Sequence, residues 1–364
     1  MYIWQRKDWP CFSWNTQKLL PLLEEIAHAE GRLQGYVETL DPRIAKDQQA
    51  LAITQEIEKS WSIEGEKLDE LMVYSSVCRR LQIEDNIPHP TSGDHIEGIV
   101  DVMMDIVENA AMPLTEQRLF AWHRNFFPTG YSGGLVIQTG AYRKKPMEIV
   151  KGPLGKTKVI FEAPEAKDVP SEMAAFMQWL NTDNEELSIK LKSAIAHLWF
   201  VTIHPFEDGN GRCARAISDY VLSKDSSVTR LYSLSVYVKR HQKQYYDELN
   251  KAQTGNLEIT SWLVWYLGCL LESIDSVLST VDKTIRMAKF FEKANSLHLN
   301  SRQEQILVKL AGDWKGPMTT SKWAKICTCS QDTASRDIKA LIDKGLLKKV
   351  SSGPATHYEL TLDT

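Results

Sequence analysis

The chain lacks the features that mark membrane and secreted proteins. Its longest strongly apolar run, residues 262–271, is too short to span a bilayer, which takes about 20 residues in a helix. Charged residues Arg6, Lys7 and Asp8 stand near the start, where a signal peptide needs an apolar core. We therefore expect a cytoplasmic protein without a membrane partner.

Cysteine is scarce, and neither sign of charge dominates. Among the six cysteines only Cys327 and Cys329 lie close together, and no second pair or nearby histidine completes a zinc site. This favours buried free thiols in a reducing compartment. The 364 residues include 43 Lys and Arg against 47 Asp and Glu, a net charge of −4 that argues against nucleic-acid binding by the protein as a whole. A local basic patch remains compatible with that balance.

Helical periodicity dominates, without an internal repeat or a low-complexity tract. Apolar residues in 187–199 recur at steps of three and four, which predicts a helix that ends just before His204. A second helix is expected from about Asn210 to Val221. The same kind of pattern predicts further helices over residues 17–40, 46–83, 97–109, 115–126, 170–181, 239–253 and 258–295. The predicted fold class is therefore mainly α.

The clearest β pattern lies at residues 147–161. Two apolar segments flank a turn cluster at 151–155 that contains both glycine and proline. This predicts a β-hairpin inside a helical domain. Taken alone, such a hairpin could be a surface ornament.

The end of the chain has its own pattern. Helices are expected at 301–311, around 320–326 and at 331–344, followed by strands at 345–350 and 357–360, which is the winged-helix order. Residues 301–364 hold ten Lys and Arg against seven Asp and Glu, a net of +3. Winged helices bind DNA or dock proteins, and this charge is compatible with both. We divide the chain into an N-terminal helical region (1–94), a core (95–295) and a winged-helix domain (296–364).

The segment His204–Arg215 holds the chemistry. His204 follows a helix, and an imidazole can accept a proton near neutral pH. A Gly-Asn-Gly turn at 209–211 comes where the next helix begins, so that glycine flexibility and unpaired N–H groups favour an anion. Arg212 and Arg215 share one face of that helix, and Asp208 is a hard oxygen ligand suited to Mg²⁺. Each piece alone could be structural, but their combination in one order indicates an active site.

This segment, HPFEDGNGRCAR, resembles the signature of Fic-domain proteins, H-x-F-x-[DE]-G-N-G-R-x-x-R, at every specified position. The resemblance extends over residues 95–280 and includes the preceding hairpin, which looks like the family's flap. It implies a helical Fic core that transfers AMP from ATP to a hydroxyl group of a protein and releases pyrophosphate. Members that act as kinases have lysine where Gly211 stands, so glycine favours adenylylation.

The resemblance also implies a role for each residue. His204 would be the general base and Asp208 the Mg²⁺ ligand. Tyr246 would line the adenine pocket, although a tyrosine packed in the core is an equally good interpretation. The remaining ATP-binding positions are Gly209, Asn210, Gly211, Arg212, Cys213, Ala214 and Arg215. The target protein would add as a strand to the flap, at Lys158, Val159 and Ile160.

A second short pattern precedes the core. Ser60, Glu64 and Gly65 fit the inhibitory motif [ST]-x-x-x-E-[GN] of the same family. The resemblance implies that Glu64 pairs with Arg215 and removes the cation that should hold the γ-phosphate. Without that context, the segment is an ordinary helix end with a serine, a carboxylate and a capping glycine.

Several alternatives remain open from the sequence. The same site could remove AMP from a target or transfer another nucleotide. A different class of function is a DNA-binding regulator whose core only senses nucleotide, although a sensor would not need the base His204. The aromatic residues within the first fifteen positions predict an arm docked on the core, with partner binding as the alternative. The sequence also allows a homodimer.

Overall fold

The computed structural model describes residues 1–83, 93–151, 158–182, 186–225, 230–312 and 314–362. Within these residues the chain is mainly helical, as predicted, and forms two compact units, Met1–Val277 and Leu278–Thr364. The division falls inside one long helix, whereas the sequence analysis placed a boundary after that helix, at residue 296.

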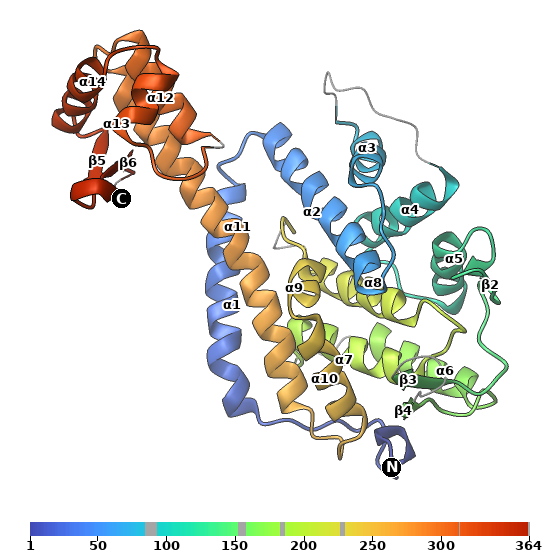
Figure 1. The fold of residues 1–364 in the computed structure, drawn as a ribbon. Helices are drawn as coiled ribbons and strands as arrows, with labels where there is room; N and C mark the ends of the chain where they lie inside the picture. Colours follow the sequence, from blue (N-terminus) through green and yellow to red (C-terminus); the bar gives the residue numbers. More distant parts are fainter. Residues whose placement is uncertain (84–92, 152–157, 183–185, 226–229, 313, 363–364) are drawn as a thin grey trace. The chain divides into compact units, whose positions relative to one another are not determined.

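The first unit is a helical domain with two small antiparallel hairpins (Figure 1). Its elements in chain order are η1 (Ile3–Gln5), α1 (Thr16–Val37), α2 (Pro42–Ile63), α3 (Glu70–Arg80), α4 (Asp94–Glu108), α5 (Glu116–Phe126), β1 (Tyr131–Ser132), β2 (Leu135–Val136), β3 (Glu148–Lys151), β4 (Lys158–Glu162), α6 (Val169–Asn181), α7 (Ile189–Ile203), α8 (Asn210–Ser223), α9 (Leu234–Arg240), α10 (Gln242–Gln253) and the first part of α11 (Thr260–Asn295).

The centre of this unit is the antiparallel pair α7 and α8, which other helices surround. Every residue of α7 from Leu191 to Ile203 is buried, which explains why this helix reads as apolar on all sides. The first turns of α11 cover the pair, and the Trp262 indole N–H donates to the carbonyl of Ala194 at 2.9 Å. The loop between the two central helices therefore connects two helices that are packed in the core.

The prediction of one helix over residues 46–83 is wrong. Gly65 has φ of +85°, a left-handed conformation that ends α2, and Asp69 caps α3 by accepting from the Met72 N–H. The predicted helix at 239–253 likewise proved to be two helices that meet at His241. Ser233 caps the first of these, α9, through the Val236 N–H.

The predicted hairpin at 147–161 is present as β3 and β4, with Val150 opposite Val159 and a bulge between Ile149 and Val150. The turn expected at 151–155 lies outside the described residues from 152 onward. A second hairpin, β1–β2, was not predicted; its turn is formed by Gly133 and Gly134, both with positive φ.

The second unit has three helices followed by a hairpin, the order that the sequence predicts for a winged helix. After the last turns of α11 come α12 (Ser301–Ala311), α13 (Thr320–Ile326), α14 (Gln331–Asp343), β5 (Leu347–Val350), η2 (Gly353–Ala355) and β6 (His357–Leu360). Trp323 is 0% exposed at the centre of its apolar core. Asn300 caps α12 and also donates to Asp337 of α14 at 2.9 Å, which fixes the two helices together.

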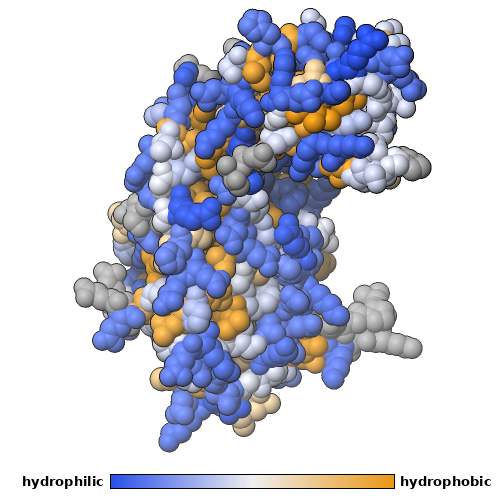
Figure 2. All heavy atoms as spheres, turned by 90° about the vertical axis from the view of Figure 1, so that its left-hand side faces the viewer, coloured by the Kyte–Doolittle hydropathy of each residue, from blue (hydrophilic) through white to orange (hydrophobic). Residues whose placement is uncertain are grey.

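One helix in the described part of the chain, α11, is long and apolar enough to cross a membrane by length and composition. Buried core helices meet the same two criteria, and Trp262, Tyr266 and Leu270 of α11 are at most 1% exposed. On the face drawn in Figure 2, apolar side chains lie in separate patches among hydrophilic ones. The buried side of the first turns of α11 is thus part of the core.

Candidate active site

The loop between α7 and α8 is fixed by its own residues. His204 adopts a left-handed conformation with φ of +53° and ends α7. Asn210 closes the loop, because its side-chain amide donates to the Phe206 carbonyl and accepts from the Phe206 N–H, both at 2.9 Å. Phe206 is 0% exposed and stacks on His123 with ring centroids 4.0 Å apart. The loop is therefore held by contacts within the protein itself.

Arg143 supports this loop through hydrogen bonds to its backbone, a role that was not predicted from the sequence. The guanidinium is 2% exposed and donates to the carbonyls of His204 at 2.8 Å, Lys145 at 2.9 Å and Pro164 at 2.5 Å. Its backbone N–H also donates to the Pro205 carbonyl at 2.8 Å. A buried cation bound to several carbonyls fixes segments far apart in sequence.

The hydrogen bonding of His204 determines which of its nitrogens can act as a base. Its Nδ1 lies 3.0 Å from the Val201 carbonyl, which can only accept, so the proton is on Nδ1. This leaves Nε2 as the acceptor. Burial lowers the pKa of His204 to about 4, with a further contribution from the positive charge of Arg143. The imidazole is therefore neutral near pH 7 and able to take a proton.

The N-terminus of α8 has the geometry of an anion site. Gly209 has φ of +78°, and a Cβ there would lie 2.6 Å from the ring of Phe127, so only glycine fits. The first backbone hydrogen bond of the helix runs from the Cys213 N–H to the Gly209 carbonyl. The N–H groups of the three residues between them are thus outside the helical ladder. The Gly209 N–H, in contrast, already donates to the Asp208 carboxylate at 2.5 Å.

Two of the predicted nucleotide contacts point into the core. Cys213 and Ala214 are both 0% exposed, and burial raises the pKa of the Cys213 thiol to about 12. Their side chains pack the helix against its neighbours. The Cys213 N–H also donates to the Gly209 carbonyl, so it is not free for a phosphate.

Asp208 lies in the loop directly before the N-cap of α8, and its carboxylate is partly exposed. It accepts hydrogen bonds from the Ser132 hydroxyl and the Gly209 N–H, and Arg212 lies 3.6 Å away. No group of three His, Cys, Asp or Glu side chains suited to a metal occurs among the described residues. A Mg²⁺ ion here would have Asp208 as its protein ligand and take the remaining oxygens from phosphates and water, which is a common arrangement for this ion.

Both arginines of α8 contact the end of α2. The Arg215 guanidinium is 4% exposed; it donates to the hydroxyl and carbonyl of Ser60 and to the carboxylate of Glu64, each at 2.8 Å. Burial alone would lower the pKa of Arg215, but Glu64 raises it above its usual value. The third nitrogen, Nη1, is buried without a hydrogen-bond partner. Nη1 is therefore a donor of the buried guanidinium that the described residues leave unused.

The same segment contacts Arg212, a contact that the sequence analysis did not predict. Arg212 is 2% exposed and donates through Nη1 to the Glu66 carboxylate at 2.9 Å. Its guanidinium lies over the ring of Phe127, 4.5 Å from the centroid. The two arginines therefore both pair with carboxylates of one segment, Ser60–Glu66.

The end of α2 is a Schellman motif. Gly65 provides the left-handed residue, its N–H donates to the Ser62 carbonyl at 3.1 Å, and the Glu66 N–H donates to the Trp61 carbonyl at 3.1 Å. The motif gives Glu64 and Glu66 fixed backbone positions one residue either side of the glycine. Lys239 and Gln242 hold the helix end by donating to the Ser62 and Ile63 carbonyls at 2.6 and 2.8 Å.

A cavity of about 470 Å³ opens beside this arrangement, which is the size of many small-molecule sites. His204, Gly211 and Glu64 line one side, so the base, the α8 N-terminus and the α2 carboxylate all reach one space. Tyr246 lines the cavity and is 44% exposed, while the neighbouring Tyr245 is 2% exposed and bonded to His197. Tyr246 is therefore exposed toward this cavity rather than packed in the core, and its contact with adenine stays a prediction.

The β3–β4 hairpin forms another wall of the cavity. Ile149, Val150 and Ile160 line it, whereas Lys158 is exposed and Val159 pairs with Val150. In the described part of the chain no strand pairs with the outer edge of β4. A strand edge without a partner strand can accept an added strand, and the N-terminal arm contacts β4 at the Glu162 carbonyl.

The N-terminal arm packs against this hairpin. The Trp4 indole N–H donates to the Glu162 carbonyl at 2.7 Å, and the rings of Tyr2 and Phe161 lie 5.1 Å apart. These contacts support the interpretation of the aromatic start as an arm docked on the core.

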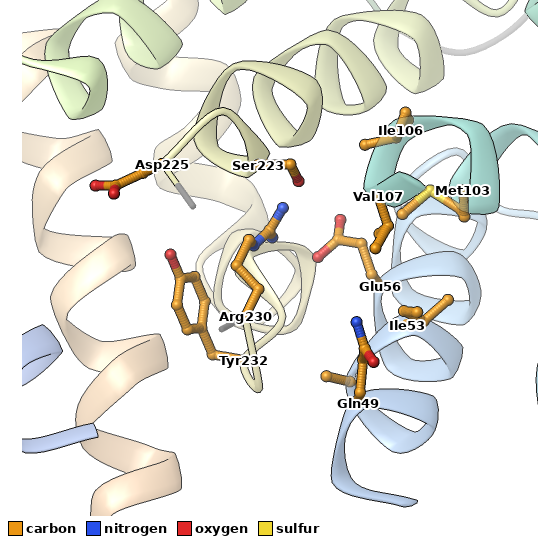
Figure 3. Close-up of a pocket in the computed structure, with 11 residues that line it drawn as sticks. Gln49, Ile53, Glu56, Met103, Ile106, Val107, Ser223, Asp225, Arg230 and Tyr232 are labelled. Atoms are coloured by element: carbon orange, nitrogen blue, oxygen red, sulfur yellow. The ribbon is translucent and has the colours of Figure 1, made fainter. Parts of the chain in front are cut away.

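Another cavity, of about 260 Å³, lies along the middle of α2, where Gln49, Ile53 and Glu56 line it (Figure 3). Glu56 and Arg230 extend into it, but both are engaged: Glu56 accepts from the Ser233 hydroxyl at 2.8 Å and the Ser235 N–H at 3.0 Å, and Arg230 pairs with Asp219 at 2.7 Å. The buried Glu56 thus joins α2 to the start of α9.

Two family models match the chain. Residues 113–222 match the Fic/DOC family, and residues 2–83 match a domain of unknown function, DUF4172. The first match contains the loop and α8; the second contains the N-terminal arm, α2 and the segment Ser60–Glu66.

Curated relatives align over the central part of the chain. A "Protein adenylyltransferase Fic" from Nematostella vectensis is 30% identical over 118 residues, which are 32% of this chain and 26% of the relative. The protein of the same name from Culex quinquefasciatus is 34% identical over 95 residues, 26% of this chain and 18% of the relative. A "Probable protein adenylyltransferase" from Aquifex aeolicus is 28% identical over 123 residues, 33% and 36% of the two chains. The aligned segments thus span at most about a third of these relatives.

Solved structures share the fold. A Fic family protein from Desulfovibrio desulfuricans G20 superposes with a TM-score of 0.55 at 22% identity, covering 94% of this chain and 95% of that one. A Fic domain containing signaling protein from Bacteroides thetaiotaomicron VPI-5482 gives a TM-score of 0.54 at 19% identity, covering 69% and 94%. The helical architecture is that of Fic proteins.

Proposed function

We propose, from the Fic/DOC family domain at residues 113–222, that this protein transfers AMP from ATP to a hydroxyl group of a protein and that it inhibits itself through the end of α2. The observation that carries the proposal is that the neutral imidazole of His204, the α8 N-terminus at Gly211 and the carboxylate of Glu64 line one cavity, and that Glu64 pairs with the buried Arg215. The names of the curated relatives support adenylyl transfer as the reaction class.

The reaction follows from these groups. The target oxygen attacks the α-phosphorus of ATP, the bond between that phosphorus and the bridging β-oxygen breaks, and pyrophosphate leaves. The proton of the target hydroxyl moves to Nε2 of His204, which the Nδ1 hydrogen bond keeps free. The α8 N-terminus and Arg212 and Arg215 neutralise the phosphates. A magnesium ion on Asp208 would supply further charge neutralisation at the phosphate oxygens.

Self-inhibition follows from which groups occupy the arginines. Nη2 of Arg215 donates to both the Glu64 carboxylate and the Ser60 carbonyl, and Nε donates to the Ser60 hydroxyl, so the γ-phosphate would have to displace protein groups. A Cβ at Gly211 would also collide with the Glu64 carboxylate, which shows how closely the glutamate approaches the α8 N-terminus. ATP would then bind with its phosphates out of line for transfer.

The β4 edge is the proposed docking site for the target. An extended segment could pair with Lys158, Val159 and Ile160 and would pass along the cavity that contains His204. Specificity would then come from main-chain pairing and from the side chains on either side of the modified residue.

The test uses Glu64→Gln, which removes the charge but keeps the side-chain size. Incubation with α-labelled ATP and magnesium is expected to label the protein itself or added protein substrates, and His204→Ala in the same background should abolish the label. Intact-mass spectrometry should show a gain of one AMP group. Transfer of label from γ-labelled ATP, or transfer from UTP or CTP in place of ATP, would overturn the proposal.

A further inference from the structure

Arg212 has little freedom to change position. Its guanidinium contacts two aromatic rings, 4.5 Å from the centroid of Phe127 and 5.7 Å from that of Trp61. The side chain is 2% exposed, and its Nε is buried without a hydrogen-bond partner. A cation stacked in this way is preorganised to meet an anion in one direction.

The anion that the Arg212 guanidinium meets in this structure is the carboxylate of Glu66. Its carboxylate lies 2.9 Å from Nη1 of Arg212, whereas the nearest other carboxylate, Asp208, is 3.6 Å from Nη2. The side chain of Glu66 is 38% exposed, so this pair combines a buried cation with an anion at the rim of the site. Such an anion can leave for water at modest cost, while the cation cannot follow it.

The backbone of Glu66 is positioned by the same turn that positions Glu64. The Glu66 N–H donates to the Trp61 carbonyl, and the turn at Gly65 separates the two glutamates. Each glutamate meets its own arginine, Glu64 with Arg215 and Glu66 with Arg212. Only the first of these pairs is part of the motif that begins at Ser60.

We infer that Glu66 is a second inhibitory carboxylate, which blocks Arg212 as Glu64 blocks Arg215. The inference rests on the proposed function, because it assumes that both arginines bind the phosphates of ATP. It follows that neutralising Glu64 alone leaves the protein partly inhibited. Full release requires that both carboxylates leave their arginines.

The experiment compares Glu66→Gln with Glu64→Gln, the double variant and a matched control. Glu70→Gln is the control. Glu70 is an exposed carboxylate in the first turn of α3, so the substitution removes the same charge four residues from Glu66. Titration calorimetry with magnesium measures the affinity for ATP and, separately, for adenosine, which has no phosphate to meet the arginines. Transfer from α-labelled ATP is measured on the same proteins.

Glu66→Gln is expected to tighten ATP binding about twofold to fivefold, the range of a partly exposed ion pair, without changing adenosine binding. The double variant should bind ATP more tightly and transfer AMP faster than Glu64→Gln. Glu70→Gln should match the wild type in every measurement.

The inference is overturned if Glu66→Gln binds ATP as the control does. It is also overturned if that variant binds ATP more weakly, because Glu66 would then orient Arg212 for the nucleotide. Absence of AMP transfer in Glu64→Gln would refute the proposed function instead, and the difference in ATP affinity would still decide the role of Glu66.

Discussion

The two segments that meet at the site are opposites in charge and in helix polarity. Ser60–Glu66 is the C-terminus of α2, where the helix dipole is negative, and it carries Glu64 and Glu66. The segment from Gly209 onward is the N-terminus of α8, where the dipole is positive, and it carries Arg212 and Arg215. The end of α2 is therefore negatively charged, as a triphosphate is. A protein segment of this charge can compete with a triphosphate for the N-terminus and the arginines of α8.

The two segments also differ in how they are held. The α8 side is built on Arg143, Asn210 and Phe206, all buried at 2% exposure or less. The α2 side rests on a glycine turn and on hydrogen bonds from Lys239 and Gln242 to backbone carbonyls. Changes on the α8 side should destroy chemistry or stability, whereas changes on the α2 side should release activity.

The largest effect is expected on the α8 side, at His204. His204→Ala combined with Glu64→Gln should lower AMP transfer by about 10²- to 10⁴-fold, the usual contribution of a general base. ATP affinity should remain close to that of Glu64→Gln alone. Label transfer and calorimetry measure the two quantities, and transfer at an undiminished rate would exclude His204 as the base.

The next effect concerns stability. Asn210→Ala leaves the buried N–H and carbonyl of Phe206 without partners and should lower the free energy of unfolding by about 2–4 kcal/mol. Urea unfolding followed by circular dichroism measures this change. A loss below about 1 kcal/mol would mean that the loop does not depend on this side chain.

The pH dependence of transfer gives a smaller effect. Because burial lowers the pKa of His204 to about 4, transfer by Glu64→Gln should stay constant down to about pH 5 and fall about tenfold per unit below pH 4. An acid limb centred near the ordinary histidine value of 6.5 would contradict the buried, neutral base.

The lowered pKa of His204 also makes the stability of the fold depend on pH, so stability has to be measured as a control. The unfolded chain binds a proton at the ordinary value of 6.5, and the native chain binds it only near 4, at both His204 and His123. As pH falls through this window, the unfolded state is favoured and stability decreases. Circular dichroism at each pH therefore has to accompany the rate measurements.

The smallest effect is expected on the α2 side, at Gly65. Gly65→Ala meets no atom within 4 Å, so its cost comes only from the left-handed backbone and should be about 1 kcal/mol. This loosens the end of α2 and should raise transfer by up to about fivefold. Gly31→Ala is the matched control: Gly31 lies inside α1, has the same free space and should leave transfer unchanged.

The α8 segment could be predicted because its chemistry is contiguous. Residues 204 to 215 carry the base, the glycine turn and both arginines in one stretch, and the apolar helices on either side are long and regular. The β3–β4 hairpin was predictable for a similar reason, since its turn cluster separates two short apolar strands. Local order along the chain was sufficient for these elements.

The residues that support the site could not be predicted, because their partners are distant in sequence. Arg143 lies in an irregular stretch and binds a carbonyl 61 positions away. Glu66 follows the known motif, but its partner Arg212 is 146 positions away. The break between α2 and α3 was available in the sequence, since Gly65 and Asp69 are both helix-boundary residues, and the apolar pattern across them was given too much weight.

The position of Trp61 predicts a change in fluorescence when the end of α2 leaves the arginines. Its indole N–H is buried without a partner, and its ring lies against both Phe126 and the guanidinium of Arg212. Departure of the α2 end would bring this ring into water and shift its fluorescence emission to longer wavelength. The residue that covers the arginine can thus serve as a native reporter of its uncovering, with Trp61→Phe as the silent reference.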